Sequence, residues 1–365
     1  MKIVRTEIYR YNIKMEPFVI ATGTMYHASN VLIKIFTDEG ITGIGECSPF
    51  PFIVGETQDT CTVMAKYFGE HLKGKDALNI DERWSEIESL TARNATAKSA
   101  FDMALYDIAA KASNLPLYKY LKGEKRTVET DITIGIGSPE EMSEAAVKYV
   151  QQGASMLKIK LGKKVKDDVE RIKAIRSAIG DKIKIRIDAN QGWSYDDALF
   201  ALNELAQYDI QFCEQPMRTW FDDLLPQLNA QVKIPIMADE SCYHAQDARR
   251  LIQTNSCKYI NIKFAKSGGF TESKKIHDIA AAANMPCMIG SMLESRLALT
   301  ANLHFAYTSP NVQFFDLDTS IMGQLEDPVI GGVKYDGFHL SIDDTIGIGA
   351  EVDEKFLASC EKITV

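Results

Sequence analysis

The spacing of hydrophobic residues changes twice along the chain. Over residues 1 to about 56, apolar and polar positions alternate, which predicts an antiparallel meander. From about 57 to 121 the apolar residues recur at helical intervals, most clearly over 96–107. The strands expected in the meander cover residues 3–13, 31–37 and 41–47. We therefore expect an α+β domain in the first third of the chain.

Beyond Gly123, short apolar runs alternate with helical segments such as 138–152 and 166–179. These runs give eight expected strands, at residues 128–136, 156–160, 183–189, 210–215, 234–239, 259–264, 286–291 and 312–318. Alternating strands and helices specify a parallel sheet. Eight such units favour closure into a (β/α)8-type barrel, a modified TIM barrel, over an open sheet.

The fold class predicted from these patterns is α/β. We expect the α+β domain to cover residues 1–124 and the barrel, with the candidate active site, to cover 125–325. The remaining segment, 326–365, has Gly-rich turns and strand-like runs, and we expect it to pack back on the first domain and complete it.

Composition narrows the class of protein. The 365 residues are 45% hydrophobic and 25% charged, which is ordinary for a globular chain. A net charge of -9 disfavours nucleic-acid and anionic-membrane partners. The seven cysteines are odd in number and form no C-x-x-C pair, and the chain begins without an apolar signal core. We therefore expect a cytoplasmic protein with reduced thiols. A homo-oligomer is compatible with the sequence, but no segment selects one.

Three acids end consecutive expected strands: Asp188, Glu214 and Asp239. The carboxyl ends of barrel strands converge on one mouth, so these acids should lie together. A set of oxygen ligands without His or Cys favours a hard cation such as Mg²⁺ over zinc. Capping of a helix by each acid in turn is the alternative for any one of them, and three in succession make it less favoured.

Lysines flank the acids. Lys158 and Lys160 lie two apart on the second expected barrel strand and so face the same side, while Lys263 ends the sixth, across the barrel. If the shared side of Lys158 and Lys160 is the barrel interior, burial and mutual repulsion would lower the pKa values of these two lysines toward the range of a general base. A strand whose lysines extend to solvent is the alternative for the pair. Opposed lysines around a metal-bound carboxylate indicate proton transfer on both faces of one α-carbon.

Asp316 and Asp318 point to one side of the eighth expected strand. The metal already has ligands elsewhere, so we expect these acids to receive a cationic part of the substrate, such as an ammonium group. Ion pairs with Lys or Arg of adjacent loops are the alternative.

Taken together, these residues resemble the enolase superfamily, in particular its muconate-lactonising branch, over essentially the whole chain. The motifs that carry the resemblance are Lys158-Ile159-Lys160, Asp188 with Asn190, Glu214-Gln215-Pro216, Asp239-Glu240-Ser241, and Lys263 with Lys266-Ser267-Gly268-Gly269. The resemblance implies that the three strand-end acids bind one Mg²⁺ per subunit. It also implies that Lys160 and Lys263 are the acid/base pair.

Within that branch, Asp316-Leu317-Asp318 is similar to the Asp-x-Asp sequence of dipeptide epimerases, in which the two acids hold the amino terminus of the substrate. The resemblance implies reversible inversion of the C-terminal residue of an L,L-dipeptide through a metal-stabilised enediolate. Lys160 would serve the L configuration and Lys263 the D configuration, with Lys158 adding positive charge.

The resemblance also implies that specificity lies in loops of the first domain, here about 18–29 and 48–57. The second loop contains the apolar run 49–54 and the first contains no Arg, which favours dipeptides with small or hydrophobic side chains. Ordinary packing between domains is the alternative for the apolar run. The residues expected to contact substrate are Asp316, Asp318, Ser291, Thr133, Phe52 and Ile53.

Four other functions fit parts of the pattern. A muconate or chloromuconate cycloisomerase, or an o-succinylbenzoate synthase, would use the same metal and lysines, but its substrate offers no ammonium for Asp316 and Asp318. A Schiff-base aldolase would leave the three-acid set unexplained. A non-catalytic barrel would be expected to have lost one of the chemical residues, and this chain has them all.

Overall fold

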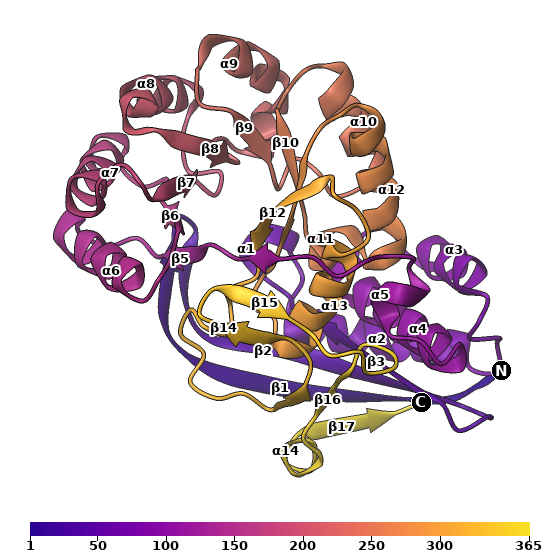
Figure 1. The fold of residues 1–365 in the computed structure, drawn as a ribbon. Helices are drawn as coiled ribbons and strands as arrows, with labels where there is room; N and C mark the ends of the chain where they lie inside the picture. The colour runs from indigo at the N-terminus through magenta and orange to yellow at the C-terminus, as the bar shows by residue number, and fades with distance from the viewer.

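Two layers of structure meet in the molecule, an antiparallel sheet with helices and a parallel barrel (Figure 1). The computed structural model describes residues 1–365. The antiparallel sheet has the order β17-β1-β2-β3. Its strands are β1 (Ile3–Ile20), β2 (Gly23–Thr37), β3 (Thr42–Cys47) and β17 (Glu361–Thr364). Its helices are α1 (Pro51–Val54), α2 (Gln58–Leu72), α3 (Ile80–Leu90), α4 (Ala95–Ala112) and α5 (Leu117–Tyr120).

The eight barrel strands are parallel and follow chain order from β5 to β12, as expected. They are β5 (Ile132–Ile134), β6 (Met156–Lys160), β7 (Lys184–Asp188), β8 (Ile210–Glu214), β9 (Ile236–Ala238), β10 (Tyr259–Ile262), β11 (Cys287–Gly290) and β12 (Val312–Asp316). The helices around them are α6 (Pro139–Gln151), α7 (Val165–Ile179), α8 (Tyr195–Leu205), α9 (Leu225–Gln231), α10 (Ala245–Gln253), α12 (Phe270–Ala282) and α13 (Arg296–Ala306), with the short α11 (Phe264–Ser267) after β10.

The first and last barrel strands meet at a seam, where single hydrogen bonds replace a regular strand ladder. β5 and β12 are the outer strands of the eight-strand order and do not pair regularly. Instead, the Asp131 backbone N–H donates to the Phe315 carbonyl at 3.3 Å. Thr130 Oγ1 accepts the Leu317 N–H at 2.8 Å. These hydrogen bonds bring the segment before β5 against the end of β12.

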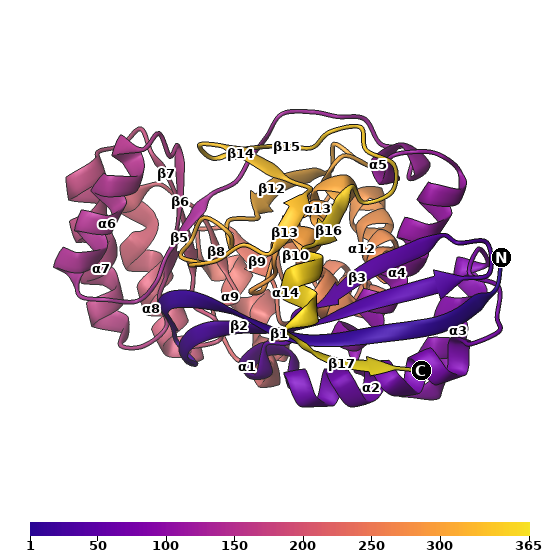
Figure 2. The same ribbon diagram turned by 90° about the horizontal axis from the view of Figure 1, so that it is seen from below.

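The long hairpin β1–β2 reaches from the first domain to the barrel strands β5 and β6 (Figure 2). Its pairing extends from Ile3 to the tight turn between Ile20 and Gly23, with an irregularity between Lys14 and Phe18. The expectation of a loop over 18–29 is therefore wrong, because apolar residues of this segment pair in register and then cover the barrel mouth. The Ile136 N–H donates to the Val19 carbonyl at 2.9 Å and holds the tip there.

The first expected barrel strand, 128–136, is two short strands. β4 (Val128–Glu129) pairs with β15 (His339–Ser341) of the C-terminal segment, and only β5 belongs to the barrel. The break falls at Thr130, whose N–H donates to the Phe338 carbonyl at 2.9 Å. The rest of the C-terminal segment contains β13 (Val329–Gly331), β14 (Lys334–Asp336), β16 (Ala350–Val352) and α14 (Glu354–Ala358).

The buried hydrophobic side chains form separate clusters in the two layers. The largest cluster joins barrel and helices and extends into the hairpin, and a second fills the space between the antiparallel sheet, α2 and α4. A small cluster of Phe212, Met237, Met288 and Phe314 fills the barrel interior below the mouth. None of the helices combines the length and the apolar composition that a bilayer crossing requires.

Candidate active site

Three acids stand in a row where adjacent strands end. Asp188 ends β7 and pairs in register with Glu214, the last residue of β8, and Asp239 follows β9. All three side chains are fully buried. After two of them the backbone turns with positive φ, 42° at Asn190 and 33° at Gln215. Such conformations are uncommon for residues other than glycine and cluster at functional sites.

A lysine forms an ion pair with the acid at each end of this row. Lys160, at the end of β6, donates from Nζ to Asp188 Oδ2 at 2.6 Å. Lys263, directly after β10, donates from Nζ to Asp239 Oδ2 at 2.9 Å. The two lysines expected to face each other therefore do occupy opposite flanks of the acids.

Lys158 lies deeper and contacts more acids. Its Nζ is 2.8 Å from Glu214 Oε2 and 2.6 Å from Asp316 Oδ2. Burial lowers the pKa of Lys158, but Asp316, Glu214 and Asp188 more than offset it, so the pKa lies well above the usual value. The expectation that crowding lowers this pKa is wrong, because carboxylates rather than the other lysine are the nearest charges. Lys158 thus stays a fixed positive charge.

The row of acids fits a hard divalent cation. Glu214 Oε2 and Asp239 Oδ1 are buried, and each has an ammonium group beside it, Lys158 Nζ at 2.8 Å and Lys266 Nζ at 2.5 Å, so positive charge already gathers at this row. Burial, then the Asp188 charge, raises the pKa of Glu214 to about 7, which shows how closely the carboxylates crowd. Oxygen donors of this kind, with no His or Cys among them, match Mg²⁺ better than zinc.

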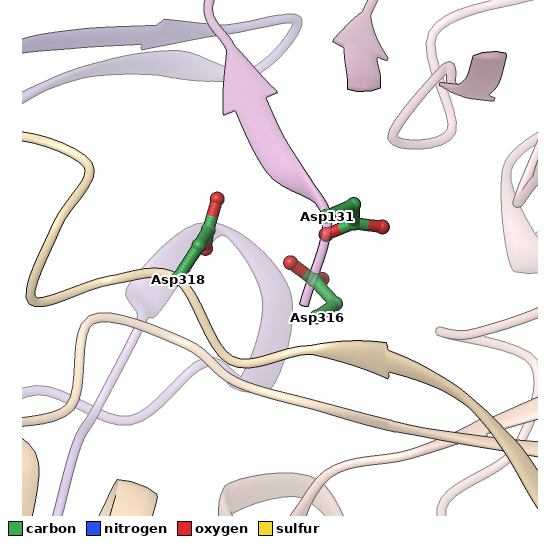
Figure 3. Close-up of side chains that lie close together, drawn as sticks. All are labelled: Asp131, Asp316 and Asp318. Atoms are coloured by element: carbon green, nitrogen blue, oxygen red, sulfur yellow. The ribbon is translucent and has the colours of Figure 1, made fainter. Parts of the chain in front are cut away.

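A second group of acids lies at the barrel seam (Figure 3). Asp131, just before β5, faces Asp316 at the end of β12, and Asp318 lies two residues further along. Their carboxylate oxygens come within 4.8 Å of one another. Asp131 is paired with Arg186 at 2.7 Å and Asp316 with Lys158.

Asp318 has no cationic partner in this group. It accepts the Thr133 N–H at 2.6 Å, a neutral donor. Burial, then the Asp316 charge, raises the pKa of Asp318 to about 7. Of the three seam acids, Asp318 is therefore the one whose charge remains available to a ligand.

One cavity of about 40 Å³ joins the lysines to the seam acids. Among the predicted site residues, Lys160, Lys263, Asp316, Asp318, Ser291, Thr133 and Ile53 line it. Phe52 does not: its side chain is 47% exposed and its ring packs over Gly23 of the hairpin. The residues of the lining that were not among the predicted contacts are Phe18, Ile20, Phe50, Asn190, Met292, Leu293 and Met322.

The segment after β11 is fixed by the first domain. Ser291 Oγ donates to the Asp316 carbonyl at 3.0 Å. Glu46, on β3, accepts the Ser295 N–H at 2.8 Å and also the Ala298 N–H at 3.1 Å, so it caps α13 from another domain. Asn30 donates to the Leu293 carbonyl at 3.1 Å. These contacts hold one wall of the cavity.

Two supporting residues were not identified from the sequence. Asn261 Nδ2 donates to Glu214 Oε1 at 2.7 Å and so orients that acid. It lies two positions before Lys263, so the strand period would have placed both on one face. Lys266, which entered the sequence analysis only as part of the motif after Lys263, is in α11 and fully buried, with Nζ 2.5 Å from Asp239 Oδ1.

Comparison with known proteins agrees with the fold. Residues 3–122 match the family described as "Mandelate racemase / muconate lactonizing enzyme, N-terminal domain", and residues 141–356 match "Enolase C-terminal domain-like". The chain is 41% identical to the D-Ala-D/L-Ala epimerase of Cytophaga hutchinsonii, over 100% of both chains. It is 39% identical to the hydrophobic dipeptide epimerase of Enterococcus faecalis, over 96% of this chain and 99% of that one.

Among solved structures, the fold is similar to that of the dipeptide epimerase from Cytophaga hutchinsonii complexed with Mg and the dipeptide D-Ala-L-Val. The TM-score is 0.98 at 41% identity, with 100% of both chains covered.

Proposed function

Because the chain belongs to the mandelate racemase / muconate lactonizing enzyme family of the enolase superfamily, we propose that it is a magnesium-dependent dipeptide epimerase. The reaction is inversion of the C-terminal residue of an L,L-dipeptide. Support comes from relatives named as dipeptide epimerases and from a solved relative complexed with Mg and a dipeptide.

One observation carries the proposal: Asp318, an acid without a cationic partner, lines the same cavity as two opposed lysines. The acid row beneath those lysines suits a metal and hence the substrate carboxylate. Asp318 suits the ammonium group at the other end. A dipeptide has both groups, and its C-terminal α-carbon would then lie beside the lysines.

We assign one Mg²⁺ per subunit to Asp188, Glu214 and Asp239. The bound ion would supply positive charge to the substrate carboxylate and so stabilise the negative charge that develops when the α-proton leaves. Asn261 holds Glu214 in place through its hydrogen bond at 2.7 Å. Lys158, kept protonated by its acidic neighbours, adds a fixed positive charge beneath the substrate.

The two flanking lysines share the proton transfer, one removing the α-proton and the other supplying a different proton to the opposite face. Lys160 takes the α-proton from the L configuration, and Lys263 donates one to the opposite face, which yields the D configuration; the reverse reaction exchanges their roles. Both side chains are more than nine-tenths buried, so bulk water has little access to the exchanging protons.

The lining indicates small or hydrophobic C-terminal residues. Seven of its fourteen residues are hydrophobic, including Phe18, Ile20 and Ile53, and the only cations in it are the two lysines. An acidic side chain would therefore find no additional cation in this cavity, which holds only about 40 Å³.

The test is mass spectrometry of a mixed L,L-dipeptide library incubated with the protein and Mg²⁺ in D₂O. One deuterium at the C-terminal α-carbon, accompanied by the L,D diastereomer and absent with Lys160→Ala, is the expected result. A strong preference for Ala-Glu would contradict the assigned side-chain preference. No exchange in any dipeptide, with Mg²⁺ binding shown by calorimetry, would refute the epimerase and favour cycloisomerase or synthase chemistry.

A further inference from the structure

A second cavity adjoins the first at the barrel seam. It holds about 250 Å³, against about 40 Å³ for the cavity at the lysines. Eight of its thirteen lining residues are hydrophobic. Its walls come from β5 and the turn after it, from α6, and from the hairpin tip, with Ile134, Ile136, Met142, Ala145 and Tyr149 among them.

The two cavities share a boundary. Phe18, Thr133 and Met322 line both of them. The hairpin forms the roof, where the Ile136 N–H donates to the Val19 carbonyl at 2.9 Å. A side chain at Gly135 would meet that carbonyl at 3.1 Å, so glycine lets the roof lie this close to β5.

The boundary lies beside Asp318. Thr133 donates its backbone N–H to the Asp318 carboxylate at 2.6 Å, and Met322 donates its N–H to the Asp318 carbonyl at 2.9 Å. Burial raises the pKa of Tyr149, and the Asp318 charge raises it further, which places the tyrosine within the field of that acid. The larger cavity therefore opens next to the carboxylate assigned to the substrate ammonium.

We infer that this second cavity binds the side chain of the N-terminal, non-reacting residue of the dipeptide, and that it selects large apolar side chains there. This inference rests on the proposed epimerase function. In an amino-terminal residue the ammonium and the side chain leave the same carbon, about 2.5 Å apart. An ammonium held by Asp318 thus places its side chain at the boundary between the cavities.

Charge and size set the class of side chain. Glu141 lines the cavity and accepts the N–H of Ser138 at 2.8 Å, and Asp318 lies at its boundary through its bond to Thr133. An N-terminal Glu would add a carboxylate beside them. A Leu or Phe side chain would instead bury its surface against Ile134, Ala145 and Met142. The side chain of the N-terminal residue therefore binds in the larger cavity, and that of the C-terminal residue in the smaller one.

The first experiment compares four dipeptides with the wild-type protein and Mg²⁺: L-Leu-L-Ala, L-Phe-L-Ala, L-Ala-L-Ala and L-Glu-L-Ala. Single buried methylenes change specificity by about 10- to 200-fold. We therefore expect kcat/KM for L-Leu-L-Ala to exceed that for L-Ala-L-Ala at least tenfold, with L-Glu-L-Ala the poorest substrate. A preference for L-Ala-L-Ala over L-Leu-L-Ala would overturn the inference while leaving the epimerase function intact.

The second experiment fills the cavity with Ala145→Leu, which keeps a good helix former in α6. The expected result is that the ratio of kcat/KM for L-Leu-L-Ala to that for L-Ala-L-Ala falls at least tenfold. Retained L-Ala-L-Ala activity also shows that the variant folds. The matched control is Glu144→Leu, which adds the same side chain at an exposed neighbouring position outside the cavity.

Equal effects of Ala145→Leu on both substrates, or no effect on either, would refute the subsite. If the wild-type protein epimerises none of the four dipeptides and none in the wider library, the proposed function fails and the inference falls with it. If L-Ala-L-Ala reacts but cavity filling discriminates nothing, only the inference fails.

Discussion

Replacing Asp318 with Asn tests how the seam acids recognise a substrate. Asp316 is already matched by the Lys158 ammonium at 2.6 Å, whereas Asp318 accepts a neutral N–H from Thr133. The charge that remains for a ligand ammonium is therefore that of Asp318. Removing one partner of a buried, hydrogen-bonded charge pair costs about 2–5 kcal/mol. We therefore expect kcat/KM for L-Ala-L-Ala to fall about 30- to 5,000-fold.

The assay separates loss of recognition from general damage by using a second substrate without the ammonium. For the wild-type protein, kcat/KM for L-Ala-L-Ala should exceed that for its N-acetyl derivative by at least a hundredfold. With Asp318→Asn the ratio should fall below about ten, because the charge that distinguishes the two substrates is gone. Asp336→Asn, the same change at an exposed position on β14, is the control and should leave both values unchanged.

The same residue predicts a pH dependence. Burial and the Asp316 charge raise the Asp318 pKa from its usual value to about 7 in the free protein. An ammonium binds the ionised form, so kcat/KM should rise as pH increases through about 7, and this limb should be absent in Asp318→Asn. The reasoning would be refuted if the variant kept kcat/KM within threefold, or if it lost activity equally toward both substrates.

Three further outcomes follow from the geometry. In D₂O, the rate of α-proton exchange should fall at least a hundredfold for L,L-dipeptides with Lys160→Ala and for L,D-dipeptides with Lys263→Ala. Equal losses on both diastereomers with either variant would contradict the assignment of the two lysines to opposite faces. Glu46→Ala leaves the N–H groups of Ser295 and Ala298 without an acceptor, so the free energy of unfolding in urea should fall by about 2 kcal/mol; an unchanged midpoint would speak against this cap. EDTA should abolish epimerisation without changing the circular dichroism, and added Mg²⁺ should restore activity and raise the Tm; activity that survives chelation would exclude the metal role.

Strand positions in the barrel could be predicted because each apolar run ends in a polar residue at the mouth. Asp188 and Glu214 illustrate this, since both are the last residues of their strands. The first barrel strand could not be predicted correctly, because part of the apolar run at 128–136 pairs with β15 of the C-terminal segment. Pairing between residues more than 200 positions apart leaves no local signal.

The grouping of acids and lysines was accessible from the sequence, but the contacts between them were not. The pKa of Lys158 depends on Asp316, which ends the last barrel strand and comes within 2.6 Å only because the barrel closes at its seam. No sequence motif marked Asp131, and its place in the site follows only from the seam, which brings it beside Asp316. The apolar run at 49–54 gave a cavity residue in Ile53 but not in Phe52, because helix α1 turns adjacent side chains in different directions.

The pairing of β17 with β1 has a consequence for how the chain is made. Glu7 is opposite Thr364 and Arg10 is opposite Glu361, so β1 gains its outer neighbour from a strand that is synthesised more than 350 positions later. Until β17 has been made, β1 has an unpaired edge, and such edges are prone to association with other chains. The antiparallel sheet is therefore completed only after all eight barrel strands have been synthesised, whereas the barrel strands can assemble in the order in which they emerge.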